Sequence, residues 1–215
     1  MFSQAVQDYL KTIYKLQMVE DVVSTSSIAR ELNVSGASVT GMLKKLANKN
    51  LADYNSYKGV RLTEMGVRNA LEILRNHRLL ELYLKDSLGF SLAKVHDEAC
   101  RLEHYVSDEF IEKIDTLLGY PQYSPLGNPI PSKDGVVPDY TSESLVNVDL
   151  NKKYKIKRIS DENNDMVDYF EKMGMLPGVD ITLLTRAPFN GPMTIAYNNH
   201  EEVIGFEVAR NIFVN

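Results

Sequence analysis

Three of the four histidines and the only cysteine of this chain lie between residues 77 and 104. They form two strings with helical spacing, His77-x3-Glu81 and His96-x3-Cys100-x2-Glu103-His104. At about 100° per residue, the first pair shares one helix face, and the second string points into an arc of roughly 100°. Imidazole, thiolate and carboxylate groups form a donor set that Mn(II), Fe(II), Co(II), Ni(II) or Zn(II) accepts. The spacing therefore predicts a metal site in which six ligands converge from two helices.

The elements that precede these ligands have the pattern of a winged helix. An amphipathic helix is expected over residues 4–20, with Asp8 inside it. Ser26 is expected to cap a short helix through residue 32, and Ser35 a third helix through residue 48. Turn residues between two β-prone runs predict a hairpin over residues 51–62. The order of helix, helix-turn-helix and hairpin defines the expected fold of this part.

The rest of the chain divides into a helical part and a β-rich part. A long helix starts after Thr63 and ends before Gly89, followed by helices over residues 92–105 and 107–118. A proline-rich stretch over residues 123–131 is interpreted as the start of a linker. Strands are expected over residues 154–159, 181–185, 193–197 and 203–208, and a short helix over 165–173. The fold class is therefore mainly α with a β-rich C-terminal domain.

Composition limits the function classes. The chain has 215 residues, of which 44% are hydrophobic and 25% charged, as in an ordinary globular protein. No apolar run approaches the roughly 18 residues needed to span a bilayer, so no membrane association is expected and a cytoplasmic location is expected. Net charge is −5, yet residues 30–61 carry six basic against two acidic residues. This segment predicts contact with phosphate.

In a winged helix the second helix of the helix-turn-helix lies in the major groove of double-stranded DNA. The exposed face of the third helix would present short polar side chains to base edges, and basic residues would contact phosphates. The predicted contacts are Ser35, Ala37, Ser38, Thr40, Lys44, Lys45, Lys58 and Arg61. Gly36 and Gly41 indicate close approach to another molecule.

Two other functions remain open from the residues alone. A Cys/His/Glu centre with an open position could activate water, which makes a metalloenzyme the first alternative. The sequence has no evident general base beside the cluster, Gly-rich phosphate loop or Ser-His-Asp pattern, so we do not expect an enzyme. A metal-binding module that does not bind DNA is the second alternative. His200 is interpreted as a surface residue.

Four strings closely resemble the diphtheria toxin repressor family of iron- and manganese-dependent transcriptional regulators, in its long form. They are Asp8-Tyr-Leu-Lys-Thr-Ile-Tyr14, His77-Arg-Leu-Leu-Glu81, Val95-His-Asp-Glu-Ala-Cys-Arg-Leu-Glu-His104 and Gly127-Asn-Pro-Ile-Pro131. The resemblance implies a winged helix (1–73), a helical dimerisation and metal-binding domain (74–123), a Pro-rich linker (124–146) and a small SH3-like β-barrel resembling FeoA (147–215).

The resemblance also implies two metal ions per protomer. Its primary site corresponds to Asp8, Cys100, Glu103 and His104, and its ancillary site to His77, Glu81, His96, Asp161 and Asn164. Asp8 is the manganese-type residue and favours Mn(II), whereas Cys100 is the iron-type residue and makes Fe(II) the alternative. Lys11 replaces a second acidic ligand of manganese-type members. A variant that uses linker Cys and His residues is not expected, because Ser124 and Leu126 stand there.

From these observations we expect a homodimeric repressor of manganese- or iron-uptake genes. One metal ion would join ligands that precede the DNA-reading helices to ligands that follow them. Two protomers related by a two-fold axis would read a palindromic operator.

Overall fold

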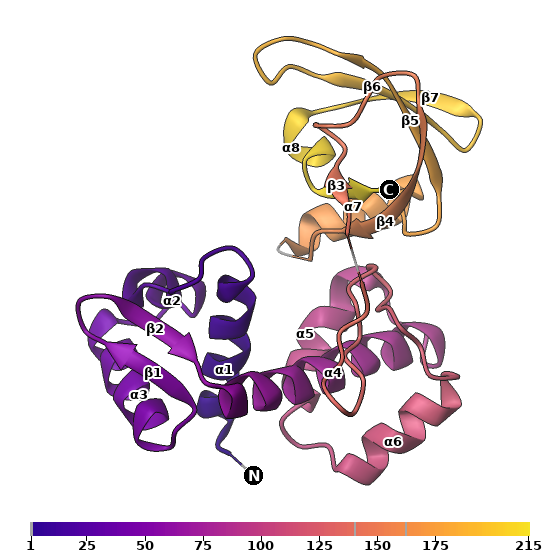
Figure 1. The fold of residues 1–215 in the computed structure, drawn as a ribbon. Coiled ribbons are helices and arrows are strands. Elements are labelled where there is room, and N and C mark those ends of the chain that lie inside the picture. The colour runs from indigo at the N-terminus through magenta and orange to yellow at the C-terminus, as the bar shows by residue number, and fades with distance from the viewer. Residues whose placement is uncertain (1, 140, 162) are drawn as a thin grey trace. The chain divides into compact units, whose positions relative to one another are not determined.

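The computed structural model describes residues 2–139, 141–161 and 163–215, which form two compact units. Of the described residues, the first unit comprises those within 2–77, 103–106 and 131–136, and the second comprises those within 78–102, 107–130 and 137–215. Helix α4 (Glu64–Asp86) is continuous in the backbone and contributes residues to both units (Figure 1).

The first unit is a winged helix, as expected. Its elements are α1 (Gln4–Gln17), α2 (Thr25–Glu31), α3 (Gly36–Asn48), β1 (Ala52–Asn55) and β2 (Gly59–Leu62). Helix α1 buries Leu10 and Ile13 completely, and α3 buries Leu43 and Leu46 against them in one core. The antiparallel β1–β2 hairpin contributes Val60 to that core. Apolar residues at helical spacing therefore hold the helix-turn-helix to α1.

Of the two N-cap residues predicted in this unit, one is confirmed and one is wrong. Ser35 caps α3, because its hydroxyl oxygen accepts a hydrogen bond from Ser38 N at 3.2 Å. The expectation that Ser26 caps α2 is wrong, since Ser24 accepts from Ser27 N at 3.0 Å instead. Ser24 has extended backbone, with ψ at 151°, as an N-cap residue requires.

In the second unit, the C-terminal end of helix α5 (Leu92–Leu102) differs from the prediction. The helix stops three residues earlier than predicted, and residues 103–105 form a turn. Ser107 then has extended backbone, with ψ at 156°, and caps α6 (Asp108–Leu117) by accepting from Phe110 N at 3.2 Å. Residues 103–106 therefore separate the end of α5 from the N-cap of α6.

The proline-rich stretch after α6 contains no helix or strand, as expected, but it is held by packing. Leu126 and Ile130 are almost completely buried. The Leu126 carbonyl accepts a hydrogen bond from Ile159 N at 3.0 Å. Gly127 has a φ of +83°, and a Cβ there would overlap the Lys157 carbonyl. This segment therefore lies against the C-terminal sheet rather than acting as a loose tether.

The C-terminal sheet has six antiparallel strands in the order β3-β8-β4-β5-β6-β7. The strands are β3 (Glu143–Ser144), β4 (Lys153–Ile159), β5 (Asp180–Arg186), β6 (Met193–Tyr197), β7 (His200–Ile204) and β8 (Ile212–Val214), with helices α7 (Asn164–Met173) and α8 (Phe206–Ala209). On β6, buried residues alternate with half-buried ones, so one face packs inward. The edge strand β3 and strand β8 were not expected.

The expected strand over residues 203–208 is wrong in its second half. Strand β7 ends at Ile204, and Gly205 is the N-cap residue that precedes helix α8. The strand begins earlier than expected because Asn198 and Asn199 adopt positive φ values of 47° and 65°. That backbone makes a two-residue hairpin turn, so Tyr197 pairs directly with His200. His200 itself is exposed, as predicted.

Candidate metal centre and DNA-reading face

The early end of α5 changes how the predicted ligands are arranged. Glu103 and His104 lie in the turn after Leu102, so they do not share a helical arc with His96 and Cys100. Two of the six predicted ligands therefore come from this turn and not from a helix. One group of ligands forms in the first unit and another in the second.

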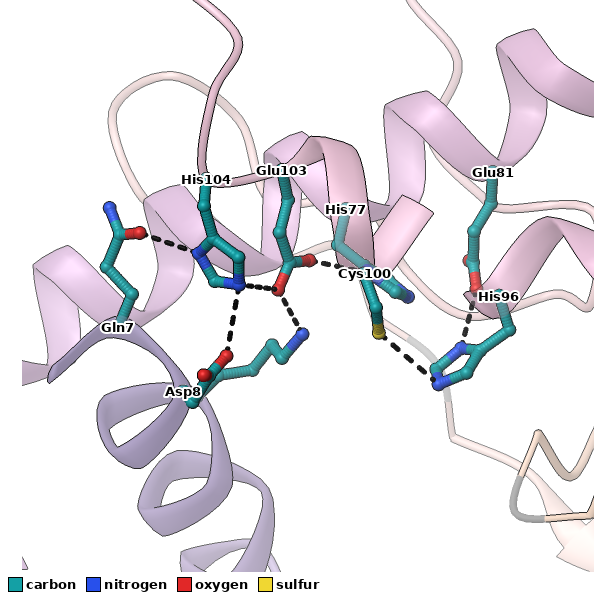
Figure 2. A network of polar contacts seen from close by, with 9 residues as sticks. Gln7, Asp8, His77, Glu81, His96, Cys100, Glu103 and His104 are labelled. Carbon is teal, nitrogen blue, oxygen red and sulfur yellow. Dashed lines mark hydrogen bonds and ion pairs between the residues drawn. The ribbon is translucent and has the colours of Figure 1, made fainter. Parts of the chain in front are cut away.

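Asp8, Glu103 and His104 form the group in the first unit. One ligand atom from each residue lies within 4.8 Å of the others. His104 Nε2 is 3.1 Å from Asp8 Oδ1 and 3.4 Å from Glu103 Oε1 (Figure 2). Two carboxylates and one imidazole nitrogen are a donor set suited to Mn(II) or Fe(II). The group therefore fits a divalent metal ion by its chemistry and its convergence.

Gln7 orients the imidazole of His104, and sequence reasoning missed this residue. Gln7 Oε1 lies 2.7 Å from His104 Nδ1. In this arrangement an Nδ1–H group would donate to the Gln7 amide oxygen, and the Nε2 atom faces the carboxylates (Figure 2). Gln7 immediately precedes Asp8 on α1, and that adjacency was the only signal in the sequence.

Glu103 is the most buried ligand, with a completely buried side chain. Its Oε2 atom lies 2.6 Å from His77 Nδ1, and its Oε1 atom is paired with the Lys11 ammonium. Burial alone would raise the pKa of Glu103, but the hydrogen bond and charge of His77 and the charge of Lys11 lower it below its usual value. Glu103 is therefore an ionised carboxylate held in a dry environment.

Asp8 lies at the rim of the group and is partly exposed. Burial raises the pKa of Asp8, although the charges of His104 and Lys11 oppose this effect and the nearby Glu103 adds to it. Two carboxylates that face one imidazole each disfavour ionisation of the other. A bound cation would relieve that repulsion.

The second unit holds Glu81, His96 and Cys100. Glu81 is almost completely buried on α4, and its Oε1 atom lies 3.1 Å from His96 Nδ1 on α5. Cys100 Sγ lies 3.7 Å from His96 Nε2 (Figure 2). The thiol is thus beside a histidine assigned to the ancillary site, whereas the resemblance assigned Cys100 to the primary site. His77 lies four residues before Glu81 on the continuous helix α4.

Asp161 and Asn164, the two ligands expected from the C-terminal domain, have other partners. Asp161 Oδ2 accepts a hydrogen bond from Asn128 Nδ2 at 3.3 Å. Asn164, the first residue of α7, donates from Nδ2 to Asp97 Oδ2 at 3.2 Å. Their roles as ligands stay predictions.

The DNA-reading face predicted on α3 is open to solvent. Exposed residues are Ser35, Ala37, Ser38, Lys44 and Lys45 on or before α3, and Lys58 and Arg61 on the hairpin. Thr40 is half-buried, and its hydroxyl donates to the Gly36 carbonyl at 2.9 Å. Arg61 is paired with Asp21, whose side chain is largely exposed. A Cβ added at Gly36 or Gly41 would meet nothing within 4 Å.

Models of known families cover most of the chain. Residues 1–60 match the N-terminal DNA-binding domain of the iron-dependent repressors, and residues 63–132 match their metal-binding and dimerisation domain. Residues 143–215 match the FeoA domain. The chain belongs to the iron-dependent repressor family. It is therefore a member of the metal-dependent transcriptional repressors, with a DNA-binding domain and a metal-binding dimerisation domain, as the resemblance implied.

Individual relatives agree with this membership. A solved manganese-dependent transcriptional repressor in complex with manganese is 37% identical, with a TM-score of 0.90, over 97% of this chain and 98% of that one. The iron-dependent repressor of Mycobacterium tuberculosis is 29% identical over 91% of this chain and 89% of its own length. The diphtheria toxin repressor of Corynebacterium glutamicum is 36% identical, but the match spans 63% of this chain and 59% of that protein.

These relatives are named as repressors. Among the residues that the structure describes, no helix is long and apolar enough to cross a membrane.

Proposed function

We propose that this family member represses transcription as a homodimer, and that it binds a palindromic duplex when a divalent metal ion is held by Asp8, Cys100, Glu103 and His104. The observation that carries the proposal is the 3.1 Å approach of Asp8 to His104. Asp8 belongs to α1, which packs in the winged-helix core, whereas His104 follows the DNA-reading elements in the chain. Ligands shared in this way couple the position of α1 to occupancy of the metal site.

The donor chemistry favours Mn(II) over Fe(II). Asp8 and Glu103 offer hard oxygen atoms, which suit Mn(II), and His104 offers one nitrogen. Cys100 would add a thiolate, which suits Fe(II) better. When bound, the ion supplies positive charge to two carboxylates that otherwise repel each other. We further propose a second ion at His77, Glu81 and His96, with Asp161 and Asn164 as the outer ligands.

The reading face would then contact DNA through two kinds of side chain. Short polar residues of α3 meet base edges, and Lys45, Lys58 and Arg61 meet phosphates. A two-fold dimer places its two reading helices about one turn of duplex apart, or a multiple of it. We propose that the regulated genes encode manganese or iron uptake. The domain boundaries 1–73, 74–123, 124–146 and 147–215 belong to the same proposal.

The first experiment measures DNA binding by metal-stripped protein. A palindromic site selected from random duplexes is titrated with protein under anaerobic conditions, with Mn(II) and with Fe(II) in turn. We expect metal to tighten DNA binding by about 5- to 150-fold, the usual range for coupling between two sites. Because linkage is reciprocal, the selected duplex should tighten Mn(II) binding by the same factor.

Asp8→Ala tests which residues mediate this coupling. We expect it to abolish the effect of Mn(II) on DNA binding, because α1 then has no ligand to share with the turn after α5. Glu20→Ala is the matched control, since Glu20 is an exposed acid just after α1. Unchanged metal dependence in Asp8→Ala would refute the proposed site. If the wild-type protein binds DNA with the same affinity with and without metal, the proposed function is refuted.

A further inference from the structure

Lys11 forms an ion pair with the same oxygen of Glu103 that faces His104. The Lys11 ammonium contacts Glu103 Oε1. His104 Nε2 lies 3.4 Å from that atom (Figure 2). Side-chain exposure is 11% for Lys11 and 0% for Glu103. Surface pairs of this kind contribute little because water screens them, whereas a pair with one partner fully buried is screened far less. The ammonium therefore acts directly on the atom that would bind the metal ion.

The position of Lys11 on α1 makes this contact part of a shared face. Gln7, Asp8 and Lys11 lie within one turn of α1, at positions i, i+1 and i+4. Gln7 contacts His104, Asp8 contacts His104, and Lys11 contacts Glu103. Each of the three thus connects α1 to the turn at residues 103–104, and Lys11 does so with a positive charge.

We propose that Lys11 is a tethered cation that competes with the divalent metal ion for Glu103 and thereby sets the metal concentration at which the protein responds. This inference rests on the proposed metal site. A +1 ammonium and a +2 ion at one carboxylate oxygen repel each other strongly where water is excluded. The ammonium and the metal ion therefore compete for the negative charge of Glu103, and their mutual repulsion weakens metal binding.

Competition has a second consequence in the metal-free protein. There the ammonium neutralises Glu103 and connects α1 to residue 103, so it stabilises the metal-free state. Removing it should lower the stability of that state and raise the affinity for metal. A residue that only packs would lower stability without tightening metal binding. A residue that only keeps Glu103 ionised would weaken metal binding when removed.

The test compares Lys11→Met with the wild type and with Lys15→Met. Methionine keeps the length of the side chain and removes its charge, and Lys15 is a half-buried lysine one turn further along α1. Mn(II) affinity of the metal-stripped proteins is measured by isothermal titration calorimetry, and thermal unfolding is followed with and without Mn(II). We expect Lys11→Met to bind Mn(II) at least about tenfold more tightly and to unfold at a lower temperature without metal. Lys15→Met should match the wild type in both measurements.

Lys11→Gln repeats the measurement with a polar neutral side chain in case Lys11→Met does not fold without metal. Lys11→Arg retains the charge and should keep the weaker affinity. Unchanged or weaker Mn(II) binding by both neutral variants overturns the inference, while Asp8→Ala still reports on the metal site itself. If the wild type binds Mn(II) no better than Asp8→Ala, the metal site and this inference both fail.

Discussion

At the level of single residues, the orientation of His104 decides what its ring can bind. Gln7 Oε1 lies 2.7 Å from Nδ1, and Nε2 faces Asp8 and Glu103. Partners that hold a ligand in this way typically contribute 10- to 100-fold to metal affinity. The ligands alone are therefore an incomplete description of the site.

Gln7→Leu should weaken Mn(II) binding by about 10- to 100-fold, because the ring loses its orienting acceptor. Gln7→Glu retains an acceptor at this position and should preserve binding. Gln4→Leu, an exposed glutamine one turn earlier on α1, is the control. Calorimetric titration of metal-stripped protein provides the measurement. Equal affinities for Gln7→Leu and Gln4→Leu would show that Gln7 has no orienting role.

At the level of elements, helix α3 carries glycines that its own packing does not explain. Gly36 begins the helix, and Gly41 lies inside it, where glycine costs about 1 kcal/mol relative to alanine. A Cβ would meet nothing at either position. By contrast, a Cβ at Gly66 would overlap the Leu51 carbonyl oxygen, so that glycine has an internal reason. We expect these glycines of α3 to allow a second molecule to come close to the helix.

Gly41→Ala should therefore have opposite effects on two measurements. The free energy of unfolding should rise by about 1 kcal/mol, because alanine favours the helix. DNA affinity in the presence of Mn(II) should fall, because the added methyl group holds the duplex away from α3. Chemical denaturation and gel retardation measure the two effects, with Asn48→Ala at the last residue of α3 as control. Unchanged DNA affinity of Gly41→Ala would show that Gly41 does not lie at the DNA interface.

At the level of the whole molecule, the C-terminal domain is connected to the helix that carries His96 and Cys100. Glu171 on α7 accepts a hydrogen bond from Leu92 N, the first residue of α5, at 2.8 Å. The other oxygen of Glu171 pairs with Lys85 near the end of α4. A carboxylate is favourable at a helix N-terminus because it meets unpaired N–H groups and the positive end of the helix dipole. The domain therefore caps α5 from 79 residues away in the chain.

Glu171→Ala should loosen the first turn of α5. The cap and the ion pair together contribute about 1 to 2 kcal/mol, so amide exchange near Leu92 should accelerate about tenfold or more. Hydrogen-exchange mass spectrometry measures this, and Asp168→Ala, which breaks an exposed ion pair with Lys172 on the same helix, is the control. Exchange that is the same in both variants would mean that the cap does not stabilise α5.

Most helices and the family could be inferred from the sequence, because the signals are local. Ser35 and Ser107 cap their helices through hydrogen bonds that span three residues, and apolar spacing selects the buried face within a few turns. The ligand types also lie close together in the chain, but only the tertiary structure showed that Glu103 and His104 group with Asp8, which is about 95 residues away in the sequence.

What the tertiary structure decided are the contacts between residues far apart in the chain. Lys11 meets Glu103 across 92 positions, and Gln7 meets His104 across 97. Such pairs depend on how whole elements pack, and periodicity within one helix carries no information about them. The residue types in the sequence therefore predicted the metal-binding chemistry. The contacts of Lys11 and Gln7 that affect metal affinity form only where α1 packs against the turn after α5.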